Sequence, residues 1–125
     1  MTGKIKKAIA SVLAVASLST CAVGISASAA TVTDSYSKFV YTKSSSSASC
    51  TLTNTTSTTR RGQVSMTIYT LDGTAFRSND ANLGNWGSTS CSYSGSTITG
   101  VEFYGTLYLN TQPVGNPISY WHKTL

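Results

Sequence analysis

The sequence predicts an all-β protein, an antiparallel β-sandwich of six to seven strands with one disulfide, preceded by a signal peptide. Three observations indicate this class. Several short runs alternate between apolar and polar residues with a period of two, and each is bounded by Gly, Asn, Asp, Pro or Ser. Two cysteines fall within this alternating region. The first thirty residues have a different composition and indicate export.

The N-terminus has the three parts of a secretory signal peptide. Residues 1–7 carry three lysines, and residues 8–25 are uncharged and mostly apolar. Small residues then offer a cleavage site after Ala29 or Ala30. A basic head, an apolar middle and an Ala-x-Ala end are typical of a cleaved export signal.

Two alternatives to simple cleavage come from the same segment. It could remain as a membrane helix, but the apolar run is short and ends without a basic flank. Cys21 could be a lipidation site, but Thr20 precedes it where such sites carry a smaller residue. We therefore expect a secreted, extracellular protein with no stable membrane anchor after cleavage.

Removal of residues 1–29 leaves a single β-sandwich domain over residues 30–125. The formal net charge of +5 includes three lysines of the leader, so the remaining chain is less basic. The remaining chain contains six basic and four acidic residues. This small positive net charge gives no reason to expect a nucleic-acid partner. The acidic residues are Asp34, Asp72, Asp80 and Glu102.

Cys50 and Cys91 are the cysteines of the expected mature protein. In an oxidising compartment, an even pair in a small chain is usually bridged. The chain-entropy model gives such a bridge about 4 kcal/mol of stabilisation. We expect it to join the two sheets; two free buried thiols are the alternative.

The segment "KSSSSASCTLTNTTSTTRRG" resembles a flexible linker in composition but a strand in pattern. Residues 48–53 alternate between apolar and hydroxyl side chains, which predicts one buried and one solvated face. Only residues 44–47 and 55–59 are expected to connect strands. Residues 36–43, rich in aromatic and β-branched residues, predict the preceding strand.

A β-hairpin is expected in the middle of the chain. Residues 63–71 place Val64, Met66 and Ile68 on one face. Asp72-Gly73 then predicts a two-residue type I′ turn, because both of its central positions need positive φ. Residues 74–77 are expected to return antiparallel, with Phe76 in the core.

The remaining residues predict one long loop and three more strands. Residues 78–88, "SNDANLGNWGS", are expected to form the longest loop, and residues 90–94 a short strand. Residues 97–110 form the longest candidate strand, and Gly100 and Gly105 within it indicate a bulge or bend. A final strand is expected over residues 118–123. The inward residues of the long strand are expected to be Val101, Phe103, Leu107 and Leu109.

Strands and turns at this spacing favour an immunoglobulin-like sandwich. Within it, "TLTNTTSTTRRGQVSMTIYTLDGTAF", residues 51–76, resembles a pattern of small exported Ig-like domains of Gram-positive bacteria. The whole layout is similar to the small Ser/Thr-rich secreted β-sandwich proteins of clostridia and their relatives. The resemblance implies the fold and supplies no catalytic residues.

The inventory of reactive side chains argues against an enzyme. A Ser-His-Asp arrangement needs a base beside its nucleophile, and His122 is the one histidine, with no nucleophile motif to accompany it. Asp80 and Glu102 could form a glycosidase pair, but scattered solubilising acids are the commoner outcome. The residues predict no metal site and no cofactor.

The aromatic residues are the one feature that suggests binding. Exposed aromatic side chains on a sheet can stack on sugar rings or anchor a protein, although tyrosines also stabilise sheets without binding anything. We expect a non-enzymatic exported binding protein, associated with the cell surface or a glycan. The alternatives are a bacteriocin-like antibacterial protein and a structural surface or matrix subunit. The candidate surface residues are Tyr69, Trp86, Tyr104, Tyr108 and Trp121.

Overall fold

A computed structural model describes residues 28–111 and 116–125, and within them the chain forms eight strands and no helix. Most of the expected signal peptide, residues 1–27, lies outside the described residues. The strands are β1 (Ser28–Thr33), β2 (Ser37–Lys43), β3 (Ser47–Asn54), β4 (Arg60–Thr70), β5 (Gly73–Leu83), β6 (Ser88–Ser94), β7 (Ile98–Tyr108) and β8 (Pro117–Thr124).

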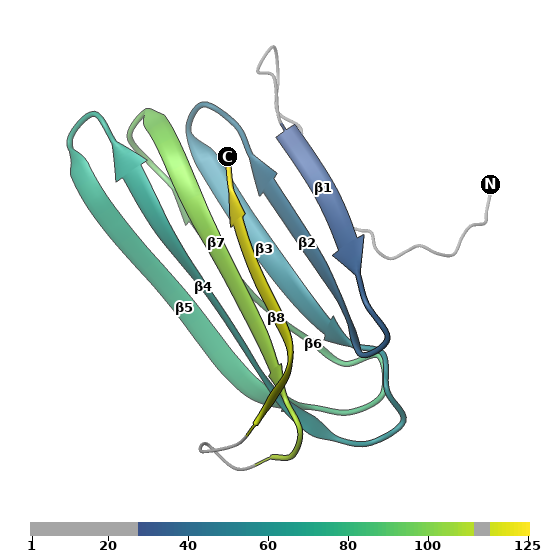
Figure 1. The fold of residues 1–125 in the computed structure, drawn as a ribbon. Helices are drawn as coiled ribbons and strands as arrows, with labels where there is room; N and C mark the ends of the chain where they lie inside the picture. Colours follow the sequence, from purple (N-terminus) through teal and green to yellow (C-terminus); the bar gives the residue numbers. More distant parts are fainter. Residues whose placement is uncertain (1–27, 112–115) are drawn as a thin grey trace, which may run out of the picture.

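The strands form two four-stranded antiparallel sheets that pack face to face (Figure 1). Sheet A has the order β1-β2-β3-β6, and sheet B has the order β5-β4-β7-β8. The chain crosses between the sheets after β3, after β5 and after β6. The predicted all-β sandwich is confirmed, with eight strands in place of six to seven.

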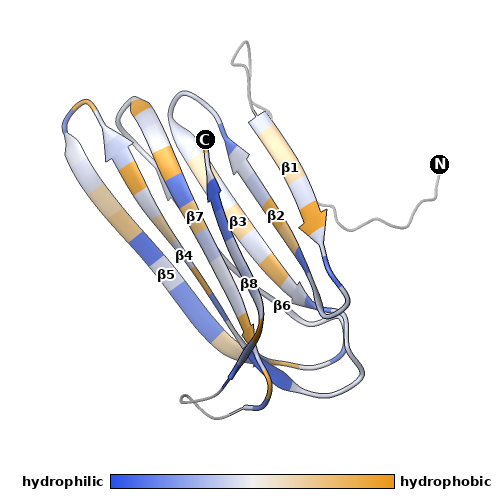
Figure 2. Cartoon of the chain, viewed as in Figure 1, coloured by the Kyte–Doolittle hydropathy of each residue, from blue (hydrophilic) through white to orange (hydrophobic). Residues whose placement is uncertain are grey.

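The core lies between the sheets and follows the period-two pattern of the sequence. Ala48, Cys50 and Leu52 of β3 are buried while the residues between them are more exposed. In Figure 2, apolar and polar bands alternate along β2, β4 and β7. Each fully buried large side chain stabilises the fold by about 1.5–3 kcal/mol. The largest are Phe39, Phe103, Leu52, Met66, Ile68 and Leu107.

The segment that resembled a linker is confirmed as a strand. It supplies β3, at the centre of sheet A between β2 and β6. Its outward residues and those of β6 are all Ser or Thr, and they pair as Ser47 with Ser94, Ser49 with Ser92, Thr51 with Ser90 and Thr53 with Ser88. The low complexity of this segment is therefore the solvent side of a sheet.

Strand β1 was not expected. It pairs along its length with β2, from Ser28 opposite Lys43 to Thr33 opposite Lys38. Its side chains are exposed or half-buried, because β1 is the edge of sheet A. An edge strand that buries little side-chain surface does not need alternating apolar residues. The small residues expected at the signal-peptide cleavage site are therefore compatible with a strand at this position.

The hairpin after β4 is confirmed, but its turn is displaced by one residue. Thr70 pairs with Gly73, so Leu71 and Asp72 form the loop. Gly73 has a φ of 137°, whereas the φ of Asp72 is not positive. The type I′ assignment was therefore wrong, since that turn needs positive φ at both central residues.

Strand β5 runs much further than expected. Residues 78–83 continue the strand, and the predicted long loop shrinks to residues 84–87. The placement of Phe76 in the core was also wrong, because it pairs with Thr67 on the outer face and is 59% exposed. Hydrophobic alternation is absent because β5 is an edge strand whose side chains are largely solvated.

In β7, the predicted inward residues Val101, Phe103 and Leu107 are fully buried. Leu109 was wrongly assigned to this face, since the strand ends at Tyr108 and Leu109 is 45% exposed. The pairing of β7 with β4 shifts register beside Gly100, as a bulge would.

The two cysteines belong to one sheet, so the expected link between the sheets was wrong. Cys50 of β3 lies directly opposite Cys91 of β6. Their sulfur atoms are 3.6 Å apart, and both are free thiols in this structure.

Candidate binding surface

The outer face of sheet B brings together three of the five predicted surface residues. Alternation along β4 and β7 points Tyr69, Tyr104 and Tyr108 away from the core. We call the outward side of sheet B the aromatic face. Its aromatic and imidazole side chains are Tyr69, Phe76, Tyr104, Tyr108, Tyr120 and His122.

Two aromatic residues of this face were not among the predicted ones. Phe76 on β5 and Tyr120 on β8 are 59% and 60% exposed, the most exposed rings of sheet B. The pairing of Thr106 with Tyr120 places Tyr120 beside the outward residues of β7. The sequence shows β8 as a short run without clear alternation, so only the register reveals this position.

Glu102 is the polar centre of the aromatic face. The Tyr69 hydroxyl donates a hydrogen bond of 2.7 Å to Glu102 Oε2, and the Tyr104 hydroxyl donates one of 2.6 Å to Oε1. His122 Nε2 lies 3.3 Å from Oε1. The Tyr104 ring stacks on the His122 ring with centroids 4.5 Å apart and planes 7° apart. The carboxylate therefore fixes the orientation of three rings from three strands.

These contacts change the protonation chemistry of the cluster. The hydrogen bond from Tyr104, followed by that from Tyr69, lowers the pKa of the Glu102 carboxyl below its ordinary value. The same bond to Glu102 raises the pKa of Tyr104 to about 12. The bond to Glu102 also raises the pKa of Tyr69. At neutral pH the cluster is therefore an ionised carboxylate held by neutral phenols.

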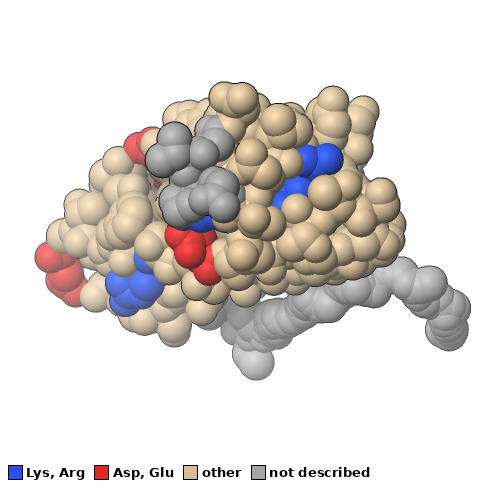
Figure 3. Space-filling model, turned by 90° about the horizontal axis from the view of Figure 1, so that it is seen from below, with Lys and Arg blue, Asp and Glu red and all other residues tan. Residues whose placement is uncertain are grey.

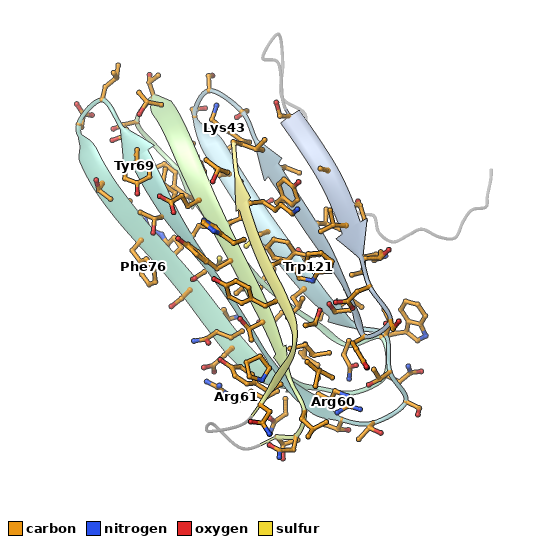
Figure 4. All side chains as sticks on the ribbon, in the orientation of Figure 1. Lys43, Arg60, Arg61, Tyr69, Phe76 and Trp121 are labelled. Carbon is orange, nitrogen blue, oxygen red and sulfur yellow. The ribbon has the colours of Figure 1, made fainter. Side chains whose placement is uncertain are left out.

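A second polar group lies at the other end of the face. Arg61 and Asp80 form an ion pair of 2.6 Å. The Arg61 guanidinium also lies 5.1 Å from the centroid of the Tyr108 ring, and the Tyr108 hydroxyl donates to Gln63 Oε1 at 3.1 Å. Tyr69, Phe76 and Arg61 can be followed along β4 and β5 in Figure 4.

The two predicted tryptophans lie elsewhere. Trp86 is in the loop between β5 and β6, where it is 63% exposed and has a φ of 64°. Trp121 is on β8 but packs partly against the core, and its Nε1 donates a 2.9 Å hydrogen bond to Ser37 Oγ of sheet A. In Figure 4 it lies toward β2, away from the labelled residues of β4 and β5.

Charge is sparse on the molecule. Seen from below, most of the visible surface is neither acidic nor basic, and charged side chains form small separate groups (Figure 3). Among residues 28–111 and 116–125, no three His, Cys, Asp or Glu side chains gather as metal ligands. Within the same ranges no helix is long and apolar enough to span a membrane.

The aromatic face is suited to holding a flat, partly apolar partner. Its rings offer surfaces for stacking, and hydrogen bonds to Glu102 and Gln63 hold several of them in place. Rings that are fixed before binding lose little conformational freedom when a ligand arrives. Neither a protein-family model nor a curated protein matches the sequence.

Proposed function

We propose that this chain is an exported, non-enzymatic protein with an Ig-like β-sandwich fold that binds a glycan on its aromatic face. The observation that carries the proposal is the gathering of six aromatic and imidazole side chains, from all four strands of sheet B, on one solvated face. The outward pairs of β3 and β6 on sheet A, by contrast, carry only hydroxyl side chains.

The shape and chemistry of the face favour a β-linked polysaccharide. Such chains are extended, and their sugar rings present apolar C–H faces and hydroxyl rims. Phe76 and Tyr120 supply exposed rings on the two edge strands, and Glu102 and Gln63 supply acceptors between them. A chain could therefore lie across the strands, stacking on rings and donating hydroxyl hydrogen bonds to the carboxylate.

Export and the disulfide belong to the same proposal. The N-terminal pattern and the resemblance to secreted proteins of Gram-positive bacteria support secretion, with cleavage after Ala29 or Ala30. Cleavage there would shorten β1 and leave β2 to β8 intact. In an oxidising compartment we expect the adjacent thiols of Cys50 and Cys91 to form a bridge within sheet A.

The proposal is tested by sedimentation of the mature protein with insoluble cellulose, chitin and peptidoglycan. We expect binding to at least one of them. A double variant, Tyr104→Ala with Tyr120→Ala, should bind at least about tenfold more weakly, as expected for loss of central aromatic anchors. The matched control is Trp86→Ala, which removes an exposed ring away from the aromatic face and should bind normally. Absence of binding to all three polymers, or equal loss in the control, would contradict the proposal.

A further inference from the structure

Cys50 and Cys91 are placed for direct reaction with each other. They are opposite residues of neighbouring antiparallel strands, and their sulfur atoms are 3.6 Å apart. Opposite residues in such a pair have Cα atoms about 4.5–5.5 Å apart, which overlaps the range of about 4.4–6.8 Å that disulfides span. A bond between the two sulfurs therefore needs little movement of either strand.

The two thiols differ in access. Cys50 is on β3, inside sheet A, and only 1% of it is exposed. Cys91 is on β6, an edge strand, and is partly exposed. Its sulfur lies 3.8 Å from the carbonyl oxygen of Arg77 on β5, at the side where the edges of the two sheets meet. Cys91 is therefore the more accessible of the two residues.

The two thiols also differ in acidity. The hydrogen bond with Cys91 and burial raise the pKa of the Cys50 thiol. The hydrogen bond with Cys50 lowers the pKa of the Cys91 thiol, burial opposes this in part, and the positive charge of Arg77 lowers the pKa further. The Arg77 guanidinium lies 5.3 Å from the centroid of the Tyr93 ring, two residues along β6 from Cys91. The accessible thiol is thus the one that ionises more readily.

We propose that Cys91 is a site of thiol–disulfide exchange, at which an external disulfide reacts first, and that Cys50 is the buried thiol that resolves the product. The external reactant is a low-molecular-weight or protein disulfide. This inference goes beyond glycan binding and rests only on the bridge expected between these two residues. It makes Cys91 the position at which a thiol-bearing partner is transiently attached.

The reaction takes place in two balanced steps. The Cys91 thiolate attacks one sulfur of the external disulfide, a new S–S bond forms at Cys91, and the second half of the reagent leaves as a thiolate. Cys50 then attacks Cys91 Sγ. The mixed disulfide breaks, the bound half takes up the Cys50 proton and leaves as a thiol, and the Cys50–Cys91 bond remains. The protein is oxidised by two electrons and the external disulfide is reduced to two thiols.

The order of reaction is tested by treating the reduced mature protein with oxidised glutathione and following the products by mass spectrometry. The Cys50→Ser variant should accumulate a stable adduct of one glutathione on Cys91. The Cys91→Ser variant should form its adduct at least about tenfold more slowly, because its remaining thiol is buried. The wild-type protein should show a transient adduct and end as the internal disulfide, with both thiols lost and no glutathione retained.

Equal adduct rates in the two variants would overturn the order of reaction. A stable adduct on the wild-type protein would instead overturn the expected bridge, so the two failures are distinguishable. Because either variant could fold poorly, the wild-type protein is also treated with limiting iodoacetamide and digested. Alkylation should appear on Cys91 before Cys50, and the reverse order would contradict the proposal.

Discussion

Gly105 of β7 lies where the two sheets approach each other closely. A Cβ atom at this position would lie 2.7 Å from Cε1 and 2.8 Å from Cδ1 of Phe39, a fully buried ring of the opposite sheet. Phe39 itself packs against Tyr41, with ring centroids 5.8 Å apart, so it has little room to yield. The close packing of the two sheets therefore requires a glycine at this position. The sequence alone indicated only a bulge or bend here.

We expect Gly105→Ala to destabilise the protein by about 1–3 kcal/mol, as overpacking of a dense core usually does. The measurement is the midpoint of urea unfolding. Gly84→Ala is the matched control, because a Cβ atom there would meet nothing within 4 Å. Its effect should stay within about 0.5 kcal/mol. Equal effects of the two substitutions would show that the sheets adjust freely at Gly105.

Tyr104 gives the fold a dependence on alkaline pH. Its pKa rises from 10.0 to about 12 in the folded protein because its hydroxyl donates to Glu102. Between these two values the folded state holds a proton that the unfolded state has lost. The stabilisation is therefore complete below pH 10 and disappears as the pH rises to about 12.

Urea unfolding measured across that pH range should show this loss, and Tyr104→Phe should show less of it. Trp86→Phe, which changes an exposed ring that has no ionisable group, is the control and should keep the wild-type slope. An unchanged slope in Tyr104→Phe would mean that the bond to Glu102 does not stabilise the fold.

Asn54 ties the end of β3 to the β3–β4 connection and to the end of β5. Its side-chain amide is fully buried and donates hydrogen bonds of 2.8 Å to the carbonyl oxygens of Thr58 and Leu83. Its Oδ1 accepts bonds from the backbone N–H and the hydroxyl of Thr56. One side chain therefore orders the β3–β4 connection and the end of β5.

Asn54→Ala would remove the side-chain partner of the buried Leu83 carbonyl oxygen and of the Thr56 backbone N–H, so we expect a loss of about 1–3 kcal/mol. Asn85→Ala is the control, since Asn85 is exposed and its side chain donates to the carbonyl oxygen of Thr56. Its effect should remain below about 1 kcal/mol. Thermal unfolding of both variants compares them directly. Similar losses in the two variants would contradict a special role for Asn54.

The position of each strand in its sheet explains how well the sequence predicts that strand. Strands β2, β3, β4 and β7 carry apolar side chains on one face, because they lie over the core, and their ends were predicted to within three residues. Strands β1 and β5 are edges with mostly solvated side chains, so they lack the alternation that reveals a strand. Their pairing partners determine them, and pairing is not visible in a single sequence.

The order of the strands in sheet B explains which residues of the candidate surface could be predicted from the sequence. The outward direction of Tyr69, Tyr104 and Tyr108 follows from alternation within β4 and β7. Phe76 and Tyr120 join them only because β5 and β8 flank those strands in sheet B. Tyr69 and Glu102 are 33 residues apart in sequence, and their hydrogen bond depends on the same arrangement. The sequence therefore predicts the members of single strands, and the sheet order assembles the face.

A β-linked glycan bound on the aromatic face would perturb the backbone amides of sheet B. We would titrate the isotope-labelled mature protein with soluble cellohexaose, chitohexaose and peptidoglycan fragments and follow the backbone amide signals by nuclear magnetic resonance. We predict that at least one of these glycans shifts amides of β4, β7 and β8, with the largest changes near Tyr104 and Tyr120, and leaves β1 to β3 unchanged. Shifts confined to β1, β2 and β3, or no shift with any of the three, would contradict the claim.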